Sequence, residues 1–370
     1  MATFRVSSEA DVVEVVRGAR ESRRTLEIVG HGTKRGFGRL VECDDVLDLS
    51  GLSGIVSYEP DEMIMTARAG TPVAEIEAAL AEHNQRLGFE PADWGPLFGT
   101  PAKSATIGGV ISANCDGSAA IRYGRCRDHL LGFRAVNGFG EAYKGGGKVV
   151  KNVTGFDLPK LFCGAMGTLG PLTEVTLRAF PRAPIAAVFR IPDLSMERGL
   201  ALLRRVWSSP LESPSLAFHA STALIRLESF QAAIDEKIAM LRNLSEPEPQ
   251  RIDDDADSVF RRIASGQMVE SEGLLWRIHL PPANAAALIG DIQPNSWCAD
   301  WAGGLLWLAS DGDAHAIAVT LNSRAIVVRG DSSIPPFAPE DRVRAQLTKR
   351  VKAAFDPLQL FNPGRIWEGV

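Results

Sequence analysis

The chain has 370 residues, 45% of them hydrophobic and 23% charged, and a formal net charge of −5. This length and composition predict a globular protein of two or three domains, and the acidic balance excludes a general attraction to nucleic acid or anionic membranes. No apolar run approaches the roughly 20 residues of a membrane-spanning helix, and the first residues lack a signal-peptide core. We therefore expect a cytoplasmic protein, attached to the inner face of a membrane at most through partners.

The first 87 residues predict alternating helices and short strands. Ser8 can cap a helix over residues 8–22, because a serine hydroxyl accepts a hydrogen bond from a free amide at a helix start. Thr71 is expected to cap a second helix, with Pro72 at its first position. Strands are expected at 25–29, 46–49, 55–58 and 63–67.

Residues 88–125 are rich in Gly, Pro and Ala and show no clear hydrophobic period. An irregular segment of this length inside a compact domain is usually functional rather than a linker. We therefore expect it to belong to a functional region.

Residues 185–330 alternate strand-like and helix-like pieces and lack glycine-rich loops, which predicts a separate α+β domain. The polar run Ser245–Asp257 is expected to be a solvated loop. A last helix is expected over 339–355. The expected strands of this region are 186–191, 223–227, 274–280, 305–309 and 325–329, and its expected helices are 196–207, 230–244, 258–264 and 284–289.

Gly30–Gly38 follows a predicted strand and is the first of three glycine-rich segments. It does not fit the dinucleotide pattern Gly-x-Gly-x-x-Gly, since Arg35 stands at the third glycine position. Its successive amides can form an anion-binding nest for a pyrophosphate, to which Thr33 and Lys34 would add a hydroxyl and an ammonium group. A tight surface turn is the alternative interpretation.

Two further segments, 106–114 and 147–170, are rich in glycine and other small residues. The first carries Thr106, Ser112 and Asn114, whose polar groups suit a ribityl chain beside a flat ring. The second places glycines where the backbone would pass against a flat or anionic ligand. It is not a Walker A loop, because Val149 replaces the magnesium-binding hydroxyl. Three such segments within 180 residues predict a large bound cofactor, FAD.

The sequence resembles the flavoproteins of the vanillyl-alcohol-oxidase type, over residues 1–180 and the C-terminal Phe355-Asp-Pro-x-x-x-Phe-Asn-Pro-Gly-Arg-Ile. Within that family it is similar to the FAD-binding subunits of bacterial glycolate oxidase. The resemblance implies an α+β fold, with a bipartite PCMH-type FAD-binding domain and a second, reduced α+β cap domain. The expected domains are 1–180 for FAD, 181–337 for the cap, and 338–370 as a C-terminal helix and tail returning to the FAD domain. The motifs shared with the glycolate oxidase subunits are 54–60, 66–80, 151–157, 276–281 and 301–307.

The resemblance also implies which residues bind FAD. The loop 29–34 would hold the pyrophosphate, 106–114 would line the flavin and ribityl chain, and the turn 164–172 would approach the adenine side and the pyrophosphate. His31 stands where many relatives have Gly, and we expect it to fill the loop without a covalent bond to FAD. The implied cofactor-binding residues are Val29, Gly30, His31, Gly32, Thr33, Lys34, Thr106, Ile107, Gly108, Gly109, Ala113, Asn114, Gly164, Gly167, Thr168, Leu169, Gly170, Leu172 and, near the flavin edge, Asn362.

The sequence assigns no catalytic residue and no metal site. Its six histidines do not pair at ligand spacing, whereas relatives that oxidise 2-hydroxy acids carry a histidine-rich segment. That oxidation needs a base and a cation for the carboxylate, for which Arg277, His279 and Arg329 are candidates. Arg277 and His279 alternate along a strand, which is also typical of an outward polar face. Ser310–His315 contains Asp-Gly and is expected to be a hairpin turn.

Cysteine and tryptophan residues bear on the question of partners. The cysteines lack Cys-x-x-Cys spacing, so we expect free thiols, and any iron–sulfur centre would lie on another chain. Trp276, Trp301 and Trp307 could be core residues or a docking surface. The five cysteines are Cys43, Cys115, Cys126, Cys163 and Cys298.

The resemblance implies an FAD-binding subunit of a heteromeric glycolate oxidase or dehydrogenase, which oxidises glycolate to glyoxylate. Its partners would be a larger FAD-linked 2-hydroxy acid oxidase subunit and an iron–sulfur subunit. The alternatives are a structural subunit that keeps the flavin fold without turnover, and a free-standing FAD-dependent alcohol or sugar oxidase. The missing histidines argue against independent oxidation of the substrate.

Overall fold

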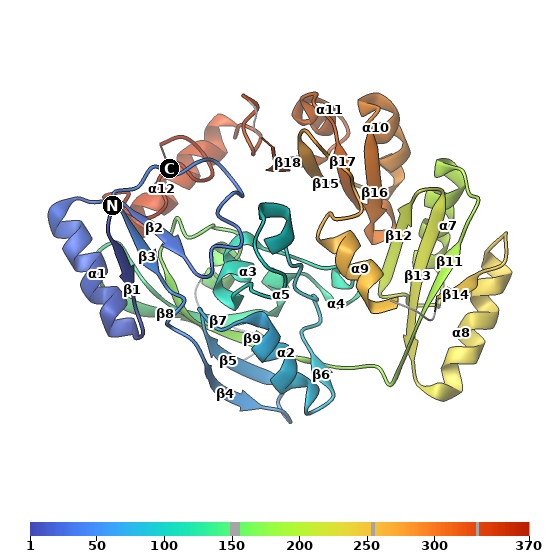
Figure 1. Cartoon of the computed structure of the whole chain (residues 1–370), viewed down its shortest axis with the longest axis horizontal. Helices are drawn as coiled ribbons and strands as arrows, with labels where there is room; N and C mark the ends of the chain where they lie inside the picture. The colour runs from blue at the N-terminus through green and yellow to red at the C-terminus, as the bar shows by residue number, and fades with distance from the viewer. Residues whose placement is uncertain (149–155, 253–255, 331–332, 370) are drawn as a thin grey trace. The chain divides into compact units, whose positions relative to one another are not determined.

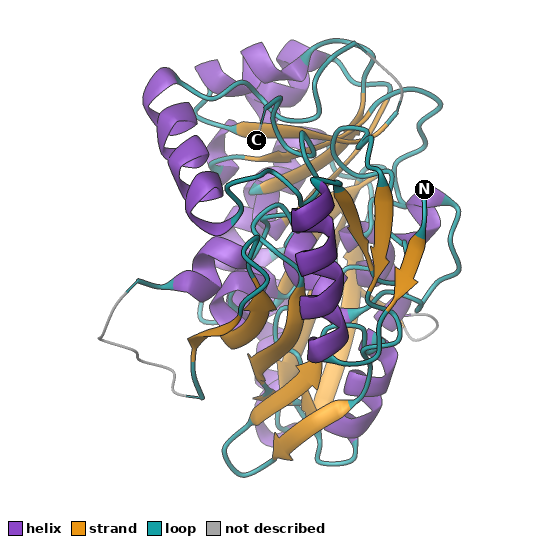
Figure 2. Cartoon of the chain, turned by 90° about the vertical axis from the view of Figure 1, so that its left-hand side faces the viewer, coloured by secondary structure: helices purple, strands orange, loops and turns teal. Residues whose placement is uncertain are grey.

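A computed structural model describes residues 1–148, 156–252, 256–330 and 333–369. Most of the motif 151–157 therefore lies outside the described residues. The chain forms two compact units, each of which combines helices and strands (Figures 1 and 2). Unit 1 comprises Met1–Cys115, Arg125–Pro181 and Pro339–Val370, and unit 2 comprises Asp116–Gly124 and Arg182–Ala338. The short segment Asp116–Gly124, which was expected in the FAD domain 1–180, belongs to unit 2.

A small parallel sheet and one helix form the N-terminal part of unit 1. The strand order is β1-β3-β2 (Figure 1). Leu26 of β2 also forms a parallel bridge with Phe361 of the C-terminal tail. Val12 and Val16 of the helix pack against Leu26 and Leu47 of the strands. The predicted Ser8 cap is confirmed, since its hydroxyl accepts from the Asp11 amide. The elements are β1 (Thr3–Arg5), α1 (Glu9–Ser22), β2 (Leu26–Val29) and β3 (Asp45–Asp48).

The second part of unit 1 is an antiparallel five-stranded sheet of order β4-β5-β9-β7-β8. The two-residue strands β6 (Gln85–Arg86) and β10 (Phe180–Pro181) pair separately. The strands are β4 (Ile55–Glu59), β5 (Ile64–Arg68), β7 (Leu130–Val136), β8 (Ala142–Gly146) and β9 (Leu172–Arg178). The helices of this part are α2 (Val73–Ala81), η1 (Gly95–Phe98), α3 (Ile107–Ala113), α5 (Cys126–His129) and α6 (Leu158–Phe162).

Two sequence predictions in this part need correction. Pro72, not Thr71, is the N-cap of α2, because the Thr71 hydroxyl donates to the Arg68 carbonyl at 2.7 Å and accepts from the Gly54 amide. The segment 88–125, which showed no period, contains α3. Helix α3 has two glycines in its first turn, after Ile107, and glycine disfavours helix, which is why its pattern was missed.

Unit 2 is built on one antiparallel eight-stranded sheet, of order β14-β11-β13-β12-β16-β17-β15-β18. One face packs against α7, α8, α10 and α11 through a core that includes Leu203, Phe218 and Trp276. The strands are β11 (Ile185–Ile191), β12 (Ser215–His219), β13 (Thr222–Ser229), β14 (Gln250–Ile252), β15 (Leu275–His279), β16 (Ser296–Asp300), β17 (Leu305–Ala309) and β18 (Arg324–Arg329). The helices are α4 (Ala120–Tyr123), α7 (Met196–Trp207), α8 (Gln231–Leu244), α9 (Ala256–Ala264), η2 (Pro282–Asn284), α10 (Ala285–Ile292), η3 (Trp301–Gly303) and α11 (Ala314–Thr320).

The strands β12, β14 and β16 were not predicted. Strand β14 lies inside the run Ser245–Asp257, so that the expectation of a continuous loop was wrong; residues 253–255 lie outside the described residues. The hairpin expected at Ser310–His315 was also wrong. Asp313 caps α11 there, by accepting from the His315 amide, and the chain continues into a helix instead of a second strand.

The last helix, α12 (Arg342–Phe355), returns the chain to unit 1. Its Lys352 is buried and donates to the Asp356 carboxylate at 2.8 Å, as well as to the carbonyls of Thr168 and Phe361. Asp356 in turn accepts from the Leu360 and Phe361 amides. Burial lowers the pKa of Lys352, and the Asp356 carboxylate opposes that shift. This ion pair therefore joins the helix, the tail and the turn at Thr168.

Across the described ranges of both units, the structure contains no helix with the length and apolarity needed to span a bilayer.

Candidate functional site

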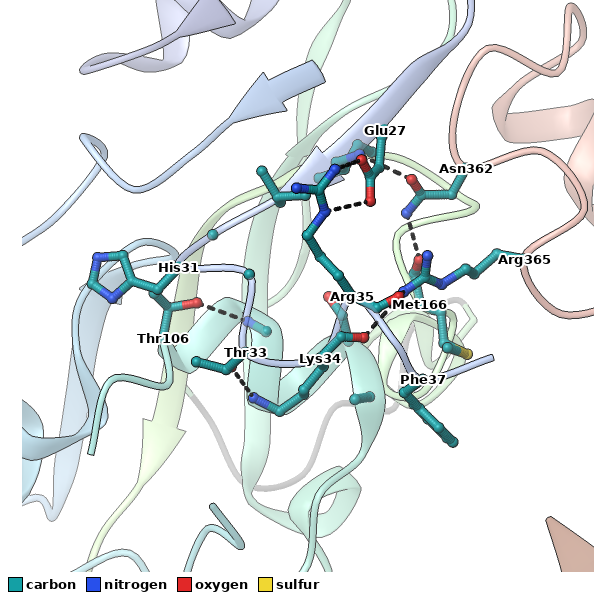
Figure 3. A pocket seen from close by; sticks show the side chains of 17 residues that line it. Glu27, His31, Thr33, Lys34, Arg35, Phe37, Thr106, Met166, Asn362 and Arg365 are labelled. Atoms are coloured by element: carbon teal, nitrogen blue, oxygen red, sulfur yellow. Dashed lines mark hydrogen bonds and ion pairs between the residues drawn. The ribbon is translucent and has the colours of Figure 1, made fainter. Parts of the chain in front are cut away.

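A cleft of unit 1 brings together the first glycine-rich loop, helix α3 and the C-terminal tail (Figure 3). The space between its atoms is about 530 Å³, including the part that is open to solvent. The lining residues are Glu27, Ile28, Val29, Gly30, His31, Gly32, Thr33, Lys34, Arg35, Phe37, Thr106, Gly109, Ser112, Ala113, Met166, Asn362 and Arg365.

The structure divides the residues implied for cofactor binding into two groups. Those that line the cleft are Val29, Gly30, His31, Gly32, Thr33, Lys34, Thr106, Gly109, Ala113 and Asn362. Those that do not line it are Ile107, Gly108, Asn114, Gly164, Gly167, Thr168, Leu169, Gly170 and Leu172. Sequence reasoning missed Glu27, Ile28, Arg35, Phe37, Ser112, Met166 and Arg365.

The loop that follows β2 presents a row of amides to the cleft. Among the described residues, no protein acceptor is recorded for the five backbone N–H groups of Gly30–Lys34. Gly32 has φ +71°, the left-handed conformation that glycine adopts without strain. Lys34 places its ammonium 3.0 Å from the Thr33 hydroxyl (Figure 3). Consecutive free amides beside a lysine form a site that suits a pyrophosphate.

Gly30 allows this loop to lie against the start of α3. A Cβ atom at residue 30 would lie 2.5 Å from the Thr106 hydroxyl oxygen. That hydroxyl accepts a hydrogen bond from the Gly109 amide and caps α3 (Figure 3). The amides of Ile107 and Gly108 donate to the carbonyls of Thr71 and Ala69. The start of α3 is therefore satisfied by the protein itself, and the free amides of the cleft belong to the loop.

Two arginines that line the cleft, Arg35 and Arg365, bind other residues of its wall. Arg35 forms a bidentate ion pair with the buried Glu27, and this pairing raises the pKa of Arg35. Arg365 is buried and donates to the carbonyls of Lys34 and Arg35 at 3.1 and 2.7 Å (Figure 3). The C-terminal tail thus holds the carbonyl groups of Lys34 and Arg35 through the Arg365 guanidinium.

Asn362 links three chain segments at one end of the cleft. Its side chain accepts from the Ile28 amide at 2.9 Å and donates to the Met166 carbonyl at 2.7 Å (Figure 3). Its own amide donates to Leu26. The Asn362 side chain therefore has defined protein partners on both its oxygen and its nitrogen.

Two glycines of the turn 164–170, Gly167 and Gly170, lie close to other parts of the protein, and the contact of this turn with the cofactor stays a prediction. A Cβ at Gly167 would lie 2.7 Å from the Asn362 side-chain nitrogen, and one at Gly170 would overlap the Val136 carbonyl. Gly170 also has φ +142°. The turn reaches the cleft through the intervening Met166.

His31 lies at the exposed edge of the cleft. Its Nδ1 donates to the Ser104 carbonyl at 2.8 Å, since a carbonyl can only accept. That bond ties the glycine-rich loop to the segment before α3.

Unit 2 contains a second group of polar residues, on the sheet face opposite its main core. Arg277 is buried and donates to the His279 ring, and its guanidinium carbon lies 5.7 Å from the ring centres of Trp301 and Trp307. The expected outward polar face is therefore wrong for Arg277. The neighbouring Asp300 is fully buried and was missed because it ends β16, a strand that the sequence did not predict.

The other candidates of unit 2 have structural positions. Arg329 donates to the Ser271 carbonyl at 2.9 Å. Trp276 and Trp307 are completely buried and Trp301 is 9% exposed, so these three tryptophans are core residues and not a docking surface.

Asp300 is expected to make unit 2 less stable as the pH rises. Burial raises the pKa of Asp300 to about 6, although hydrogen bonds from Ser118 and the Trp301 amide favour its charged form. Between about pH 4 and 6 the folded state holds a proton that the unfolded state has lost. The free energy of unfolding therefore falls through this window, by about 3 kcal/mol for a shift of two pH units.

The variant Asp300→Asn separates the effect of Asp300 on the pH dependence of the free energy of unfolding from the effects of other groups. Relative to wild type, the variant should gain about 3 kcal/mol between pH 4 and pH 7. Urea unfolding followed by tryptophan fluorescence measures it, because five of the seven tryptophans lie in unit 2. A difference that stays constant with pH would contradict the assignment.

Several known proteins are similar to this chain in sequence. The sequence profile of the FAD binding domain family matches residues 1–146. Glycolate oxidase subunit GlcE of Escherichia coli (strain K12) is 32% identical over 363 residues, which cover 96% of this chain and 96% of that protein. Glycolate oxidase subunit GlcD of Bacillus subtilis (strain 168) is 36% identical over 124 residues, covering 34% of this chain and 25% of that protein.

Solved structures show the same fold at low sequence identity. p-Cresol methylhydroxylase with substrate bound has a TM-score of 0.73 at 13% identity, covering 99% of this chain and 88% of that chain. 4-Ethylphenol oxidase from Gulosibacter chungangensis has a TM-score of 0.72 at 13% identity, covering 99% of this chain and 89% of that chain.

The chain thus has the fold of these two solved structures and an FAD binding domain, and together with the full-length similarity to a glycolate oxidase subunit this defines an FAD-dependent oxidoreductase. Within this class, the chain belongs to the family of glycolate oxidase FAD-binding subunits represented by GlcE. The α+β fold class, the FAD cofactor and the family that the sequence predicted are confirmed.

Proposed function

We propose that this chain is the FAD-binding subunit of a complex that oxidises glycolate, or a similar 2-hydroxy acid, to the 2-oxo acid. The observation that carries the proposal is the end-to-end similarity to GlcE, over 96% of both chains. A larger FAD-linked oxidase subunit, of the kind named GlcD, would hold the substrate. An iron–sulfur subunit would receive the electrons, and any attachment to a membrane would come from these partners.

The cleft of unit 1 fits FAD on the strength of its own residues. The amides of Gly30–Lys34 and the Lys34 ammonium would bind the pyrophosphate, and Thr106, Gly109 and Ala113 would lie along the ribityl chain and ring. Bound FAD supplies an acceptor for two electrons from the substrate, which it can pass on.

Lys34→Met is expected to weaken FAD binding by about 10-fold, because one charge-assisted hydrogen bond to phosphate is lost. Riboflavin, which lacks the pyrophosphate, should bind the variant and the wild type equally. Titration of the apoprotein with each flavin, followed by fluorescence, measures both affinities.

Lys103→Met is the matched control, because Lys103 is exposed and does not line the cleft. It should leave both affinities unchanged. Equal weakening of FAD and riboflavin in the Lys34 variant would show that Lys34 does not contact the pyrophosphate.

The arrangement in unit 2 supports placing the substrate chemistry on a partner. Binding a 2-hydroxy acid needs a cation that can reach the carboxylate. Arg277 is only 3% exposed and is engaged with His279 and two indole rings. It would have to leave these contacts to bind a substrate, at a considerable cost in free energy.

The visible spectrum of the purified chain under anaerobic conditions, before and after glycolate, tests the proposal. We expect the flavin band to stay oxidised with this chain alone and to bleach once the partner subunits are added. Bleaching by the chain alone would make it a free-standing oxidase and direct attention to Arg277 and His279. A band that never bleaches in the assembled, active complex would make the chain a structural subunit.

A further inference from the structure

Two cysteines from different helices of unit 1 lie side by side. Cys126 is the first residue of α5 and Cys163 follows the last residue of α6, and their sulfur atoms are 3.7 Å apart. Cys126 is completely buried, whereas Cys163 is half-buried. The pair is separated by 36 intervening residues, so the proximity is produced by the tertiary structure.

The two helices are held together independently of the thiols. Lys160 of α6 donates to the Arg127 carbonyl and, at 3.1 Å, to the Asp128 carboxylate of α5. A disulfide has a sulfur–sulfur bond of about 2.05 Å. To form it, the two sulfur atoms must move closer to each other by less than about 2 Å. Small rotations of two side chains and a slight shift of the helix ends can supply this movement.

We propose that Cys126 and Cys163 form a reversible thiol–disulfide site, which a peroxide oxidises. The more exposed Cys163 loses its thiol proton and its sulfur attacks one oxygen of hydrogen peroxide; the O–O bond breaks, the released hydroxide takes up that proton and leaves as water, and Cys163 becomes a sulfenic acid. The Cys126 thiol then attacks the Cys163 sulfur; the S–S bond forms, the S–O bond breaks and the second water leaves. Two thiols are oxidised and one peroxide is reduced to two waters.

The site is connected to the FAD cleft. The Cys163 thiol donates to the Asn114 side-chain oxygen at 3.2 Å, and Asn114 is the C-cap of α3. The next residues of the turn bind the same helix, since the Gly164 amide donates to Ile111 and the Met166 amide to Ser112. Met166 and Ser112 both line the cleft.

Disulfide formation draws Cys163 away from Asn114 and breaks that hydrogen bond. The helix and turn that carry Ser112 and Met166 lose one shared contact. We expect the oxidised protein to bind FAD about 3- to 10-fold more weakly, which corresponds to the net contribution of one hydrogen bond.

The test is graded peroxide treatment of the full-length holoprotein, followed by thiol counting and peptide mass spectrometry. We expect a Cys126–Cys163 cross-linked peptide that dithiothreitol removes. Cys163→Ser and Cys126→Ala should each abolish it, and Cys43→Ser should retain it, because Cys43 lies elsewhere in unit 1 and is also half-buried. Cys126→Ala is chosen because a small apolar residue is tolerated at a buried site.

The wild-type measurement decides the matter even if one variant fails to fold. Absence of the cross-link at peroxide doses that oxidise Cys43 would overturn the proposal. So would a disulfide that joins Cys163 to a cysteine other than Cys126. FAD titration of the oxidised and re-reduced protein then measures the expected change in affinity.

Discussion

Lys352→Met is expected to lower the free energy of unfolding of unit 1 by about 3–5 kcal/mol. Lys352 and Asp356 are both buried, at 2% and 0% side-chain exposure. Methionine fills a similar volume but leaves the Asp356 carboxylate without its cation. The carbonyls of Thr168 and Phe361, which accept from the Lys352 ammonium, lose a donor as well. Urea unfolding followed by far-ultraviolet circular dichroism measures the loss.

Two further variants separate the buried charge from a general effect of removing a lysine. Lys349→Met changes an exposed position of the same helix and should alter stability by less than about 0.5 kcal/mol. Adding Asp356→Leu to Lys352→Met removes the stranded carboxylate and should recover part of the loss. Recovery stays incomplete because the Leu360 and Phe361 amides then lack their acceptor. A cost for Lys352→Met of less than about 1 kcal/mol would contradict the role given to the ion pair.

Gly30→Ala is expected to weaken FAD binding by about 10- to 100-fold, the equivalent of the usual cost of overpacking. The new Cβ would lie 2.5 Å from the Thr106 hydroxyl. Thr106 cannot rotate away without releasing the Gly109 amide, which its hydroxyl caps. The loop must therefore move outward, and its row of amides moves with it. Titration of the apoprotein with FAD measures the affinity.

The double variant Gly30→Ala with Thr106→Ala tests this cause directly. Removing the Thr106 hydroxyl relieves the overlap, so the double variant should bind FAD more tightly than Gly30→Ala alone. Gly18→Ala is the matched control, since no atom lies within 4 Å of the Cβ it would add, and it should leave binding unchanged. Wild-type affinity in Gly30→Ala would refute the contact between loop and helix as a determinant of the site.

Local signals were reliable where neighbouring residues decide the structure. The Ser8 cap and helix α1 follow from side chains within four residues of one another. The same reasoning failed at Thr71, whose hydroxyl bonds to Arg68 and to the distant Gly54 instead of the helix start. It also failed at α3, because the Ile107 and Gly108 amides find acceptors on a separate segment, at Thr71 and Ala69.

Some residues of the candidate site could likewise be predicted from the sequence, and others could not. The loop 29–34 could be found from its glycines and its lysine, since an anion-binding nest is a property of consecutive amides. Arg365 and Asn362 belong to a tail more than 300 residues away in sequence. Only folding shows that Arg365 binds the loop backbone at Lys34 and that Asn362 binds the preceding strand at Ile28. The prediction that Arg277 and His279 lie on the same face of a strand was correct. The sequence could not show that Arg277 on this face is buried.

The sequence by itself determined the FAD cofactor, the family and the first loop of the cleft, because these depend on short segments whose backbone chemistry can be read from the chain. Only the tertiary structure decided that Gly167 lies against Asn362, that Asp300 is a buried acid, and that Cys126 lies beside Cys163. Each of these depends on which distant residues pack together. Burial and close approach are properties of that packing, and no local pattern encodes them.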